Sequence, residues 1–296
     1  MQRVDVDVDG GRVAVWRREG DGPCLLLLHG GPGLSDYLEG LADELGEGWN
    51  MAGYQQRGLA PSTEAGPFTV ARHVADARAV LEALGWERAY AVGHSWGGHL
   101  ALHLAVAIPT RIAGVLAVDP LGGVGDGGFE RFGAELSART PAADRERAEA
   151  LDERAMRGEG TEEDMRESLA LFWPAYHARR DAPPPMPPLR VSIACYAETL
   201  ASIQAEMPAL EARLPNLVMP VGFVAGAKSP IPVQDASGAT AARIPGAWLE
   251  VIDEAGHFPW LERPGCVVAA ARRLVDQVQG SAQSVSGAHR GVSASR

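Results

Sequence analysis

The chain has 296 residues and a formal net charge of −11, with 27 Lys and Arg against 38 Asp and Glu. This acidic excess argues against a protein that binds nucleic acid or anionic membranes, because such binding depends on clustered Lys and Arg. The N-terminal segment has no apolar signal core, and the apolar run from Cys24 to Leu28 is too short to span a bilayer. We therefore expect a soluble, cytoplasmic protein that contacts neither nucleic acid nor membrane; its oligomeric state stays open.

The first part of the chain alternates predicted strands and helices. Alternating polarity predicts an opening hairpin, and the unbroken apolar run 24–28 predicts a central strand that is covered on both faces. Such alternation of strand and helix is typical of a doubly wound, mostly parallel sheet. The expected strands are 4–8, 12–16, 24–28, 51–54, 89–93 and 112–118, and the expected helices are 69–84 and 96–108.

An insertion then interrupts this alternation. A glycine-rich stretch at 121–128 leads into charged, helical sequence, a proline cluster at 183–188 and a further helix through 214. Strand 217–225, helix 234–243, strand 247–252 and helix 266–278 resume the sheet pattern. The sequence thus predicts a core over 1–121 and 216–279, a helical cap over 122–215, and a disordered tail over 280–296, where five serines and almost no large apolar side chains occur.

A motif of the form Gly-x-Ser-x-Gly lies between the strand 89–93 and the helix that follows it. It comprises Gly93-His94-Ser95-Trp96-Gly97, and a strand–turn–helix is the context in which this motif displays a nucleophilic serine. The flanking glycines leave room for a tight turn, and the helix points its positive end at the site. The pattern predicts Ser95 as a nucleophile.

A serine nucleophile needs a general base, which in this arrangement follows the last strand. His257 lies there, in the loop Asp253–Pro259, and is the predicted base. We expect structural roles for His73, His94, His99, His103 and His177. The i, i+4 spacing of His99 and His103 suits a metal pair, but no third ligand accompanies them, so we predict no metal site.

Attack by a serine on a carbonyl needs backbone N–H groups that face the developing oxyanion. Trp96, directly after the nucleophile, is expected to supply one. The second is expected from the glycine-rich loop His29-Gly30-Gly31-Pro32-Gly33, with Gly31 as first choice and Gly30 as second. A simple tight turn is the alternative role of that loop.

Three motifs together, His29–Gly33, Gln56-Arg57-Gly58 and Gly93–Gly98, resemble the proline iminopeptidase branch of the α/β-hydrolase superfamily. The resemblance covers nearly all of the chain except the cap and tail. It implies an α/β-hydrolase fold with a cap over the pocket, no cofactor, and small-molecule substrates that carry an ester, lactone or amide bond. One departure weakens the peptidase interpretation: that branch has Asp-Gln-Arg-Gly where this chain has Gln55-Gln56-Arg57-Gly58.

The acidic member of the triad departs from the pattern as well. Hydrolases of this type usually place it in the loop after the strand that follows the cap, where this chain has Ser229. We predict Asp119 instead, because it ends the strand 112–118 at the edge where active sites of open α/β sheets gather. Turn capping before Pro120 is the alternative role of Asp119, and Asp235 and Asp253 are alternative acids.

The predicted function is that of a serine hydrolase forming an acyl-enzyme. A proline iminopeptidase-like aminopeptidase is the alternative, and a noncatalytic ligand-binding protein or a lyase on the same fold is a second one. Trp173, Tyr176, Met186 and Tyr196 are expected either to line the pocket or to pack within the cap. Glu198, Glu206 and Glu211 are candidates for a substrate ammonium group, or form a solvated helix face.

Overall fold

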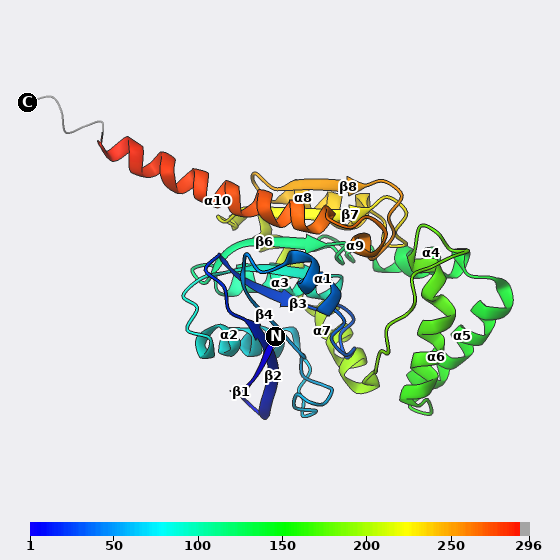
Figure 1. Cartoon of the computed structure of the whole chain (residues 1–296). Helices are drawn as coiled ribbons and strands as arrows, with labels where there is room; N and C mark the ends of the chain where they lie inside the picture. The colour runs from blue at the N-terminus through cyan, green and yellow to red at the C-terminus, as the bar shows by residue number, and fades with distance from the viewer. Residues whose placement is uncertain (291–296) are drawn as a thin grey trace, which may run out of the picture.

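The computed structural model describes the backbone of residues 1–290 and, apart from Met156, the side chains of residues 1–280. Over these residues, one sheet has the strand order β1-β2-β4-β3-β5-β6-β7-β8 (Figure 1). Strand β2 pairs antiparallel with β1 and β4, and the other neighbours are parallel. The strands are β1 (Gln2–Val8), β2 (Gly11–Arg18), β3 (Cys24–Leu28), β4 (Asn50–Tyr54), β5 (Ala89–His94), β6 (Ile112–Val118), β7 (Val221–Gly226) and β8 (Trp248–Ile252).

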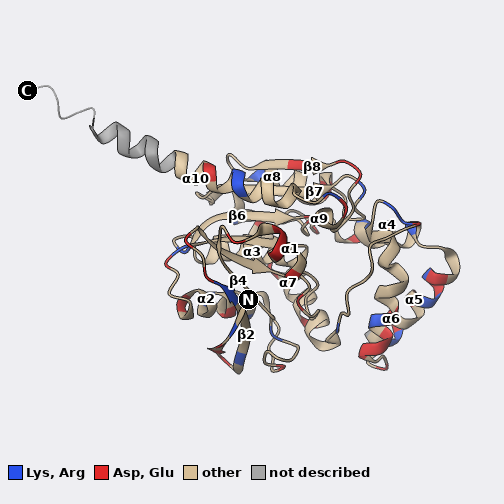
Figure 2. Cartoon of the chain, in the orientation of Figure 1, with Lys and Arg blue, Asp and Glu red and all other residues tan. Residues whose placement is uncertain are grey.

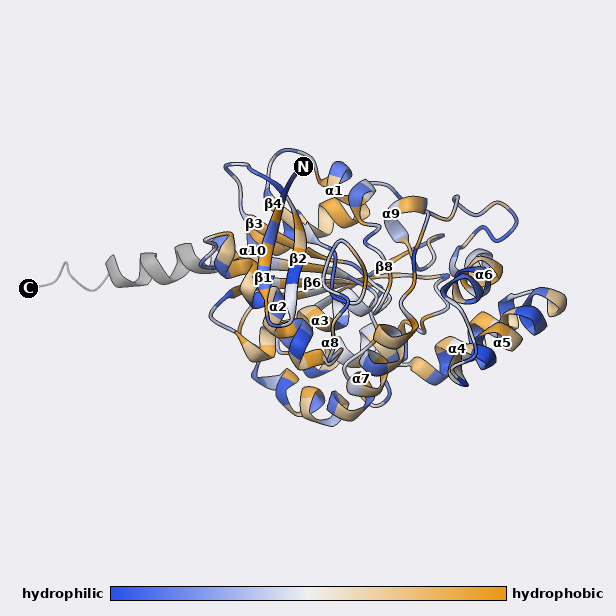
Figure 3. Ribbon diagram, turned by 90° about the horizontal axis from the view of Figure 1, so that it is seen from below, coloured by the Kyte–Doolittle hydropathy of each residue, from blue (hydrophilic) through white to orange (hydrophobic). Residues whose placement is uncertain are grey.

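Burial explains the apolar runs of the central strands. Every residue of β5, β6 and β7 is buried, since helices cover both faces of the sheet. Figure 3 shows the strands in the middle of the fold as largely hydrophobic. Because β3, β5, β6, β7 and β8 are parallel, their carboxyl ends meet at one edge, and this edge positions the candidate site.

Two apolar clusters lie on opposite faces of the sheet. One includes residues of α2, α3, α7 and α8, and the other includes residues of α1, α9 and α10. Over residues 1–290, none of the helices is long and apolar enough to cross a membrane. These helices are α1 (Glu39–Leu45), α2 (Val70–Ala83), α3 (Trp96–Ala107), α7 (Ile193–Arg213), α8 (Ala239–Arg243), α9 (Pro259–Glu262) and α10 (Cys266–Arg290).

Helices fill the insertion between β6 and β7. The chain forms α4 (Phe129–Arg139), α5 (Ala142–Met156), α6 (Glu162–Phe172), the 3₁₀ turn η1 (Trp173–Tyr176), α7 and the 3₁₀ turn η2 (Leu214–Asn216). Helices α4, α5 and α6 project to one side of the sheet, whereas α7 packs on α2 and α3 (Figure 1). Both acidic and basic residues occur on α5 and α6 (Figure 2), and the Arg147–Glu167 ion pair joins the two helices. The division at 122 and 215 stays a prediction.

Several boundaries differ from those expected. Helices α1 and α9 were not predicted, and residues 217–220 precede β7 rather than belong to it. The expected helix 234–243 begins as the π-helix η3 (Gln234–Gly238). Helix α10 extends to Arg290, past residue 280, where a disordered tail was expected to begin; the tail stays a prediction. Residues 291–296 lie outside the described part of the chain.

Candidate active site

Ser95 lies in a sharp turn between β5 and α3, which we call the elbow. Its backbone has φ 55° and ψ −121°, a conformation that L-residues rarely adopt and that marks stored strain. A side chain at Gly97 would meet the carbonyl oxygen of His29 at 2.7 Å, so the close approach of the elbow to β3 requires glycine there. The half-buried Ser95 side chain lines a cavity.

His257 and Asp119 meet beside this turn. His257 Nδ1 lies 2.6 Å from Asp119 Oδ2, and both side chains are buried. Asp119 directly follows β6 and has φ 43°, so its backbone is also strained. His257 lines the same cavity as Ser95. Within residues 1–280, no hydrogen bond joins the Ser95 hydroxyl to the His257 ring; such bonds are often long in ligand-free enzymes and tighten when substrate binds.

Ser229 supports the Asp119 carboxylate instead of replacing it. The Ser229 hydroxyl donates to Asp119 Oδ2 at 2.5 Å while its oxygen accepts the Ile231 N–H at 3.0 Å. The Gly226 N–H donates to Asp119 Oδ1 at 3.0 Å. With His257 Nδ1–H, three donors face this side chain, which is the arrangement that an ionised, acceptor-only carboxylate satisfies.

Burial acts on both members of the Asp119–His257 pair. It raises the pKa of Asp119, against the lowering effect of the hydrogen bonds from Ser229 and Gly226. Burial, together with the nearby His177, lowers the pKa of His257. A neutral His257 with its proton on Nδ1 leaves the Nε2 lone pair free, and a free lone pair is what a general base needs.

The other two predicted acids lie elsewhere. Asp235 forms an exposed ion pair with Arg131, with Asp235 Oδ2 at 2.9 Å from Arg131 Nη1. Asp253 is exposed, and its carbonyl accepts from Arg263. Of the three acids considered from the sequence, Asp119 alone contacts the His257 ring in the described side chains.

The loop after β3 lies against the elbow. A Cβ atom at Gly30 would come within 2.7 Å of Ser95 Cβ, so the loop backbone approaches the nucleophile closely. The Gly30 N–H donates to the Tyr37 hydroxyl at 2.9 Å and is therefore occupied. Gly31, with φ 55°, lines the cavity together with Trp96. Because Trp96 opens α3, its N–H has no partner within the helix. The geometry favours Gly31 over Gly30 as an oxyanion donor.

Gln56 ties this loop to the elbow. Its side chain donates to the His29 carbonyl at 2.8 Å and accepts from Trp96 Nε1 at 2.8 Å. Gln55, where the resembling branch has aspartate, holds the neighbouring turn: it accepts the Asp36 N–H and donates to the Leu34 carbonyl. Both glutamines therefore fix backbone next to the candidate oxyanion donors.

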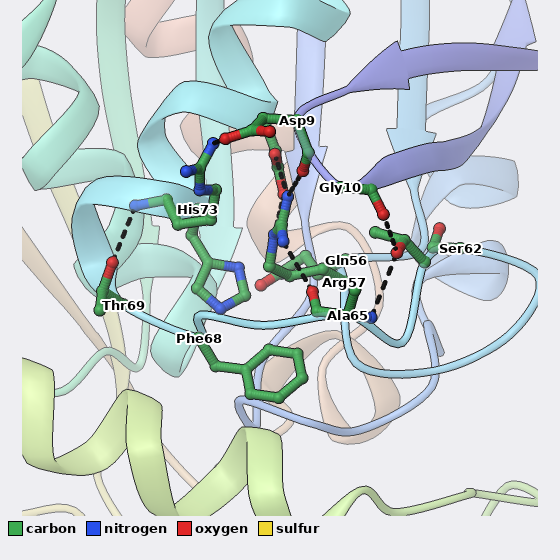
Figure 4. Close-up of polar contacts among 12 residues, drawn as sticks. Asp9, Gly10, Gln56, Arg57, Ser62, Ala65, Phe68, Thr69 and His73 are labelled. Carbon is green, nitrogen blue, oxygen red and sulfur yellow. Dashed lines mark hydrogen bonds and ion pairs between the residues drawn. The ribbon is translucent and has the colours of Figure 1, made fainter.

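Arg57, the next residue along the chain, anchors the same segment. Its guanidinium forms a buried bidentate pair with Asp76 at 2.6 and 2.8 Å. Two further bonds reach the carbonyls of Ala65 and Asp9, as Figure 4 shows. Satisfying a buried guanidinium in this way requires excellent geometry, so the loop that carries Gln56 is held rigidly.

The cavity beside Ser95 has a volume of about 350 Å³. Core residues form one wall and the insertion forms the other, which includes Trp173, Tyr176 and Tyr196 as the sequence suggested. Met186 is not among the residues that line the cavity; it packs, partly buried, against one of the two apolar clusters. Sequence reasoning missed Phe132, whose ring centroid lies 6.4 Å from that of His257, and Tyr37. Helical periodicity marks Phe132 only as an apolar position, and no motif marks Tyr37.

The acidic residues that line the cavity are not those expected. Glu198, Glu206 and Glu211 accept hydrogen bonds from the Phe68 N–H, the Ser202 hydroxyl and the Gly125 N–H, away from the cavity wall. Glu149 and Asp152 of α5 line the cavity instead, and neither has an ion-pair partner among the described side chains.

The two histidines with i, i+4 spacing, His99 and His103, contact each other, with 3.1 Å between their Nε2 atoms.

Comparisons with known proteins agree with this architecture. A family model described as the alpha/beta hydrolase fold matches residues 23–264. The chain is 36% identical over 106 residues to a proline iminopeptidase of Thermoplasma volcanium, covering 34% of this chain and 36% of that protein. It is 34% identical over 138 residues to a dihydrolipoyllysine-residue acetyltransferase component of an acetoin cleaving system from Cupriavidus necator, covering 45% of this chain and 37% of that protein. The chain thus spans well under half the length of these relatives.

Among solved structures, the proline iminopeptidase of Mycobacterium smegmatis is similar with a TM-score of 0.67 and 24% identity, over 95% of this chain and 100% of that one. An epoxide hydrolase from an endophytic Streptomyces gives a TM-score of 0.68 and 24% identity, over 94% and 96%. At this level of identity the similarity concerns the fold alone.

Proposed function

Because the chain belongs to the α/β-hydrolase fold family, we propose that it is a serine hydrolase that cleaves an ester, lactone or amide bond of a small molecule through an acyl-enzyme. The observation that carries this proposal is the contact of 2.6 Å between His257 Nδ1 and Asp119 Oδ2 at the cavity that Ser95 lines. Nucleophile, acid and base follow in the chain order Ser95, Asp119, His257, which is the order of this fold's hydrolases.

In the proposed mechanism, His257 Nε2 takes the proton of the Ser95 hydroxyl as its oxygen attacks the substrate carbonyl carbon. The Gly31 and Trp96 N–H groups donate to the oxyanion that forms. The protonated His257 then gives its proton to the leaving oxygen or nitrogen, and the acyl group stays on Ser95. A water molecule, deprotonated by His257, releases the acid and restores the hydroxyl. Asp119 holds the Nδ1–H tautomer throughout.

The insertion is proposed to act as a cap. Phe132 and Tyr176 of the insertion line the cavity, and their ring centroids lie 6.4 and 5.3 Å from that of His257. Apolar walls with few polar groups suit a substrate that is largely apolar, and exclusion of water strengthens the electrostatic interactions around the oxyanion.

A second candidate function is an aminopeptidase resembling proline iminopeptidases. The observation that favours it is the pair Glu149 and Asp152, which lie i, i+3 apart on α5 and line the cavity. Two carboxylates without a basic partner suit a substrate with a free ammonium group. Gln55 in place of an aspartate argues against this candidate, since it removes a charge near the site.

One panel of substrates separates these functions. Purified protein is assayed with p-nitrophenyl esters and with proline p-nitroanilide, and a fluorophosphonate probe reports the nucleophile. A serine esterase hydrolyses the esters and is labelled at Ser95, and Ser95→Ala abolishes both. Preference for the anilide, lost in Asp152→Asn but retained in Glu206→Gln, supports the aminopeptidase. No labelling of the wild-type protein contradicts both and supports a noncatalytic or lyase function.

A further inference from the structure

Three hydrogen bonds link four segments around the site. The Gly30 N–H bonds to the Tyr37 hydroxyl at 2.9 Å, and that hydroxyl lies 2.6 Å from His94 Nδ1. His94 Nε2 in turn lies 2.7 Å from the carbonyl oxygen of His257. The bonds start at the oxyanion loop, His29–Gly33, and pass through the segment before α1 and through the elbow. They end at the loop Asp253–Pro259, which carries the candidate base. We name this chain of bonds the Tyr37–His94 relay.

Each bond of the relay has only one possible direction. The His257 carbonyl can only accept, so His94 Nε2 carries a proton and donates. In a neutral ring Nδ1 is then an acceptor, and the Tyr37 hydroxyl must donate to it. The oxygen of that hydroxyl keeps a lone pair for the Gly30 N–H, which can only donate. Reversing the direction of any of these hydrogen bonds would leave a buried polar group unpaired.

Packing keeps the two relay side chains in these states. His94 is buried, and its ring contacts those of Phe258 and Trp260 with centroid distances of 4.8 and 4.7 Å. Burial lowers the pKa of His94 well below its usual range and raises that of Tyr37. Both groups are therefore neutral, as the hydrogen-bond directions require.

The ends of the relay reach the two parts of the proposed machinery. At one end, Tyr37 holds the Gly30 N–H, and the next peptide, which carries the Gly31 N–H, is held through the Gly30 carbonyl oxygen at 3.0 Å from His29 Nδ1, so two successive peptides of this loop are fixed. At the other end, the His257 residue is held twice: its carbonyl accepts from His94, and its N–H donates to the Tyr176 carbonyl at 2.7 Å. Asp119 then fixes the ring, so both the main chain and the imidazole of His257 have defined positions.

We infer that Tyr37 and His94 are positioning residues that lock the oxyanion loop and the base loop into one geometry, so that both are in place when Ser95 attacks. This inference rests on the proposed serine hydrolase function. Neither side chain needs to touch the reacting atoms, and the Tyr37 hydroxyl acts through Gly30 and His94.

Tyr37→Phe tests the relay, because it removes one hydroxyl and retains the ring. We expect the rate of fluorophosphonate labelling of Ser95 and the kcat for a p-nitrophenyl ester to fall about 10- to 100-fold, with KM nearly unchanged, since misplacement of catalytic groups on the ångström scale costs this much. Tyr54→Phe is the matched control: the Tyr54 hydroxyl is buried and, among the described residues, has no hydrogen-bond partner. It should leave the labelling rate unchanged.

A double-mutant cycle separates a relay from two independent contacts. His94→Gln keeps an amide donor that can reach the His257 carbonyl but has only a methylene where the ring bears Nδ1, so no acceptor atom remains at the position that faces Tyr37. If the relay acts as a unit, adding Tyr37→Phe to His94→Gln has little further effect on kcat, because the hydroxyl has already lost its acceptor. Additive losses would overturn the inference.

The ¹⁵N chemical shifts of the His94 ring give a readout that does not depend on activity. We expect a protonated Nε2 and an unprotonated Nδ1 in the wild-type protein, with the Nδ1 shift altered in Tyr37→Phe. A protonated Nδ1 would overturn the inference. In the labelling assay, an unlabelled wild-type protein overturns both the hydrolase proposal and the relay, whereas a labelled wild-type protein with equally labelled Tyr37→Phe overturns the relay alone.

Discussion

Replacement of Asp119 by asparagine probes the candidate triad most directly. Both carboxylate oxygens accept in the structure: Oδ1 from the Gly226 N–H at 3.0 Å, and Oδ2 from Ser229 and His257. An amide nitrogen in the Oδ1 position would face the Gly226 N–H, donor against donor, so the amide nitrogen must take the Oδ2 position. It then donates to His257 Nδ1, which forces the ring proton onto Nε2. In that tautomer Nε2 cannot accept the Ser95 proton.

The expected loss follows from this tautomer change. A triad serine enzyme with the wrong tautomer loses about 10⁴-fold in kcat, which corresponds to about 5.4 kcal/mol at about 1.36 kcal/mol per tenfold. Ser229→Ala removes one hydrogen bond to the carboxylate and keeps the tautomer. Such a bond contributes about 1.5 to 3 kcal/mol, so its loss lowers kcat by at most about 10- to 150-fold. Asp119→Asn should therefore be at least about 50-fold more damaging.

The assay measures kcat of both variants on the ester that the wild-type protein hydrolyses fastest, with melting temperatures as a check on folding. The reasoning is refuted if Asp119→Asn and Ser229→Ala, both folded, lower kcat by the same factor. A small effect of each would show that another group orients His257.

Three further predictions concern stability and specificity. Arg57→Met removes one partner of the buried pair with Asp76 and should cost about 3 to 5 kcal/mol in urea unfolding; a cost below about 1 kcal/mol would contradict a structural role for the pair. Burial lowers the pKa of His99 to about 4 and of His103 to about 2, so the unfolded chain binds more protons and stability is lost as pH falls below about 6.5, by about 1.4 kcal/mol per pH unit for each histidine. His103→Leu should make this slope shallower by about one proton, and an unchanged slope would contradict the assignment. Phe129 lines both the main cavity and an adjoining one of about 250 Å³. Phe129→Ala should therefore shift the preference among p-nitrophenyl esters to longer acyl chains. An unaltered chain-length profile would contradict the view that Phe129 separates the two cavities.

The sequence predicts the central strands well because their signal is local. The apolar runs 24–28 and 112–118 are strands at those bounds, and strand 89–93 extends by one residue to His94. The short helix α1 was missed because its seven residues, which begin with Glu39 and Gly40, give no clear periodicity. Helix α7 lies in the region expected to form the cap, and it packs on α2 and α3. Sequence pattern cannot tell which of two apolar surfaces a helix will cover.

The same distinction between local and long-range signals applies to the residues of the candidate site. Ser95 lies in a Gly-x-Ser-x-Gly motif and His257 in the loop after the last strand, so the sequence alone indicates both residues. The contact between Asp119 and Ser229 spans 110 residues of sequence and depends on the pairing of β6 with β7. Tyr37 reaches His94 across 57 residues, from a segment with no regular structure. Contacts of this kind follow from how loops pack together, which neither spacing nor composition encodes.

The meeting of Asp119 and Ser229 has an evolutionary consequence. The two side chains leave neighbouring parallel strands and approach to 2.5 Å beside the ring of His257. A lineage that gained a carboxylate at position 229 would hold two carboxylates beside the ring until position 119 changed, and only one of them could be ionised at this distance. The place of the histidine's acidic partner is thus defined by the sheet edge, which both positions reach.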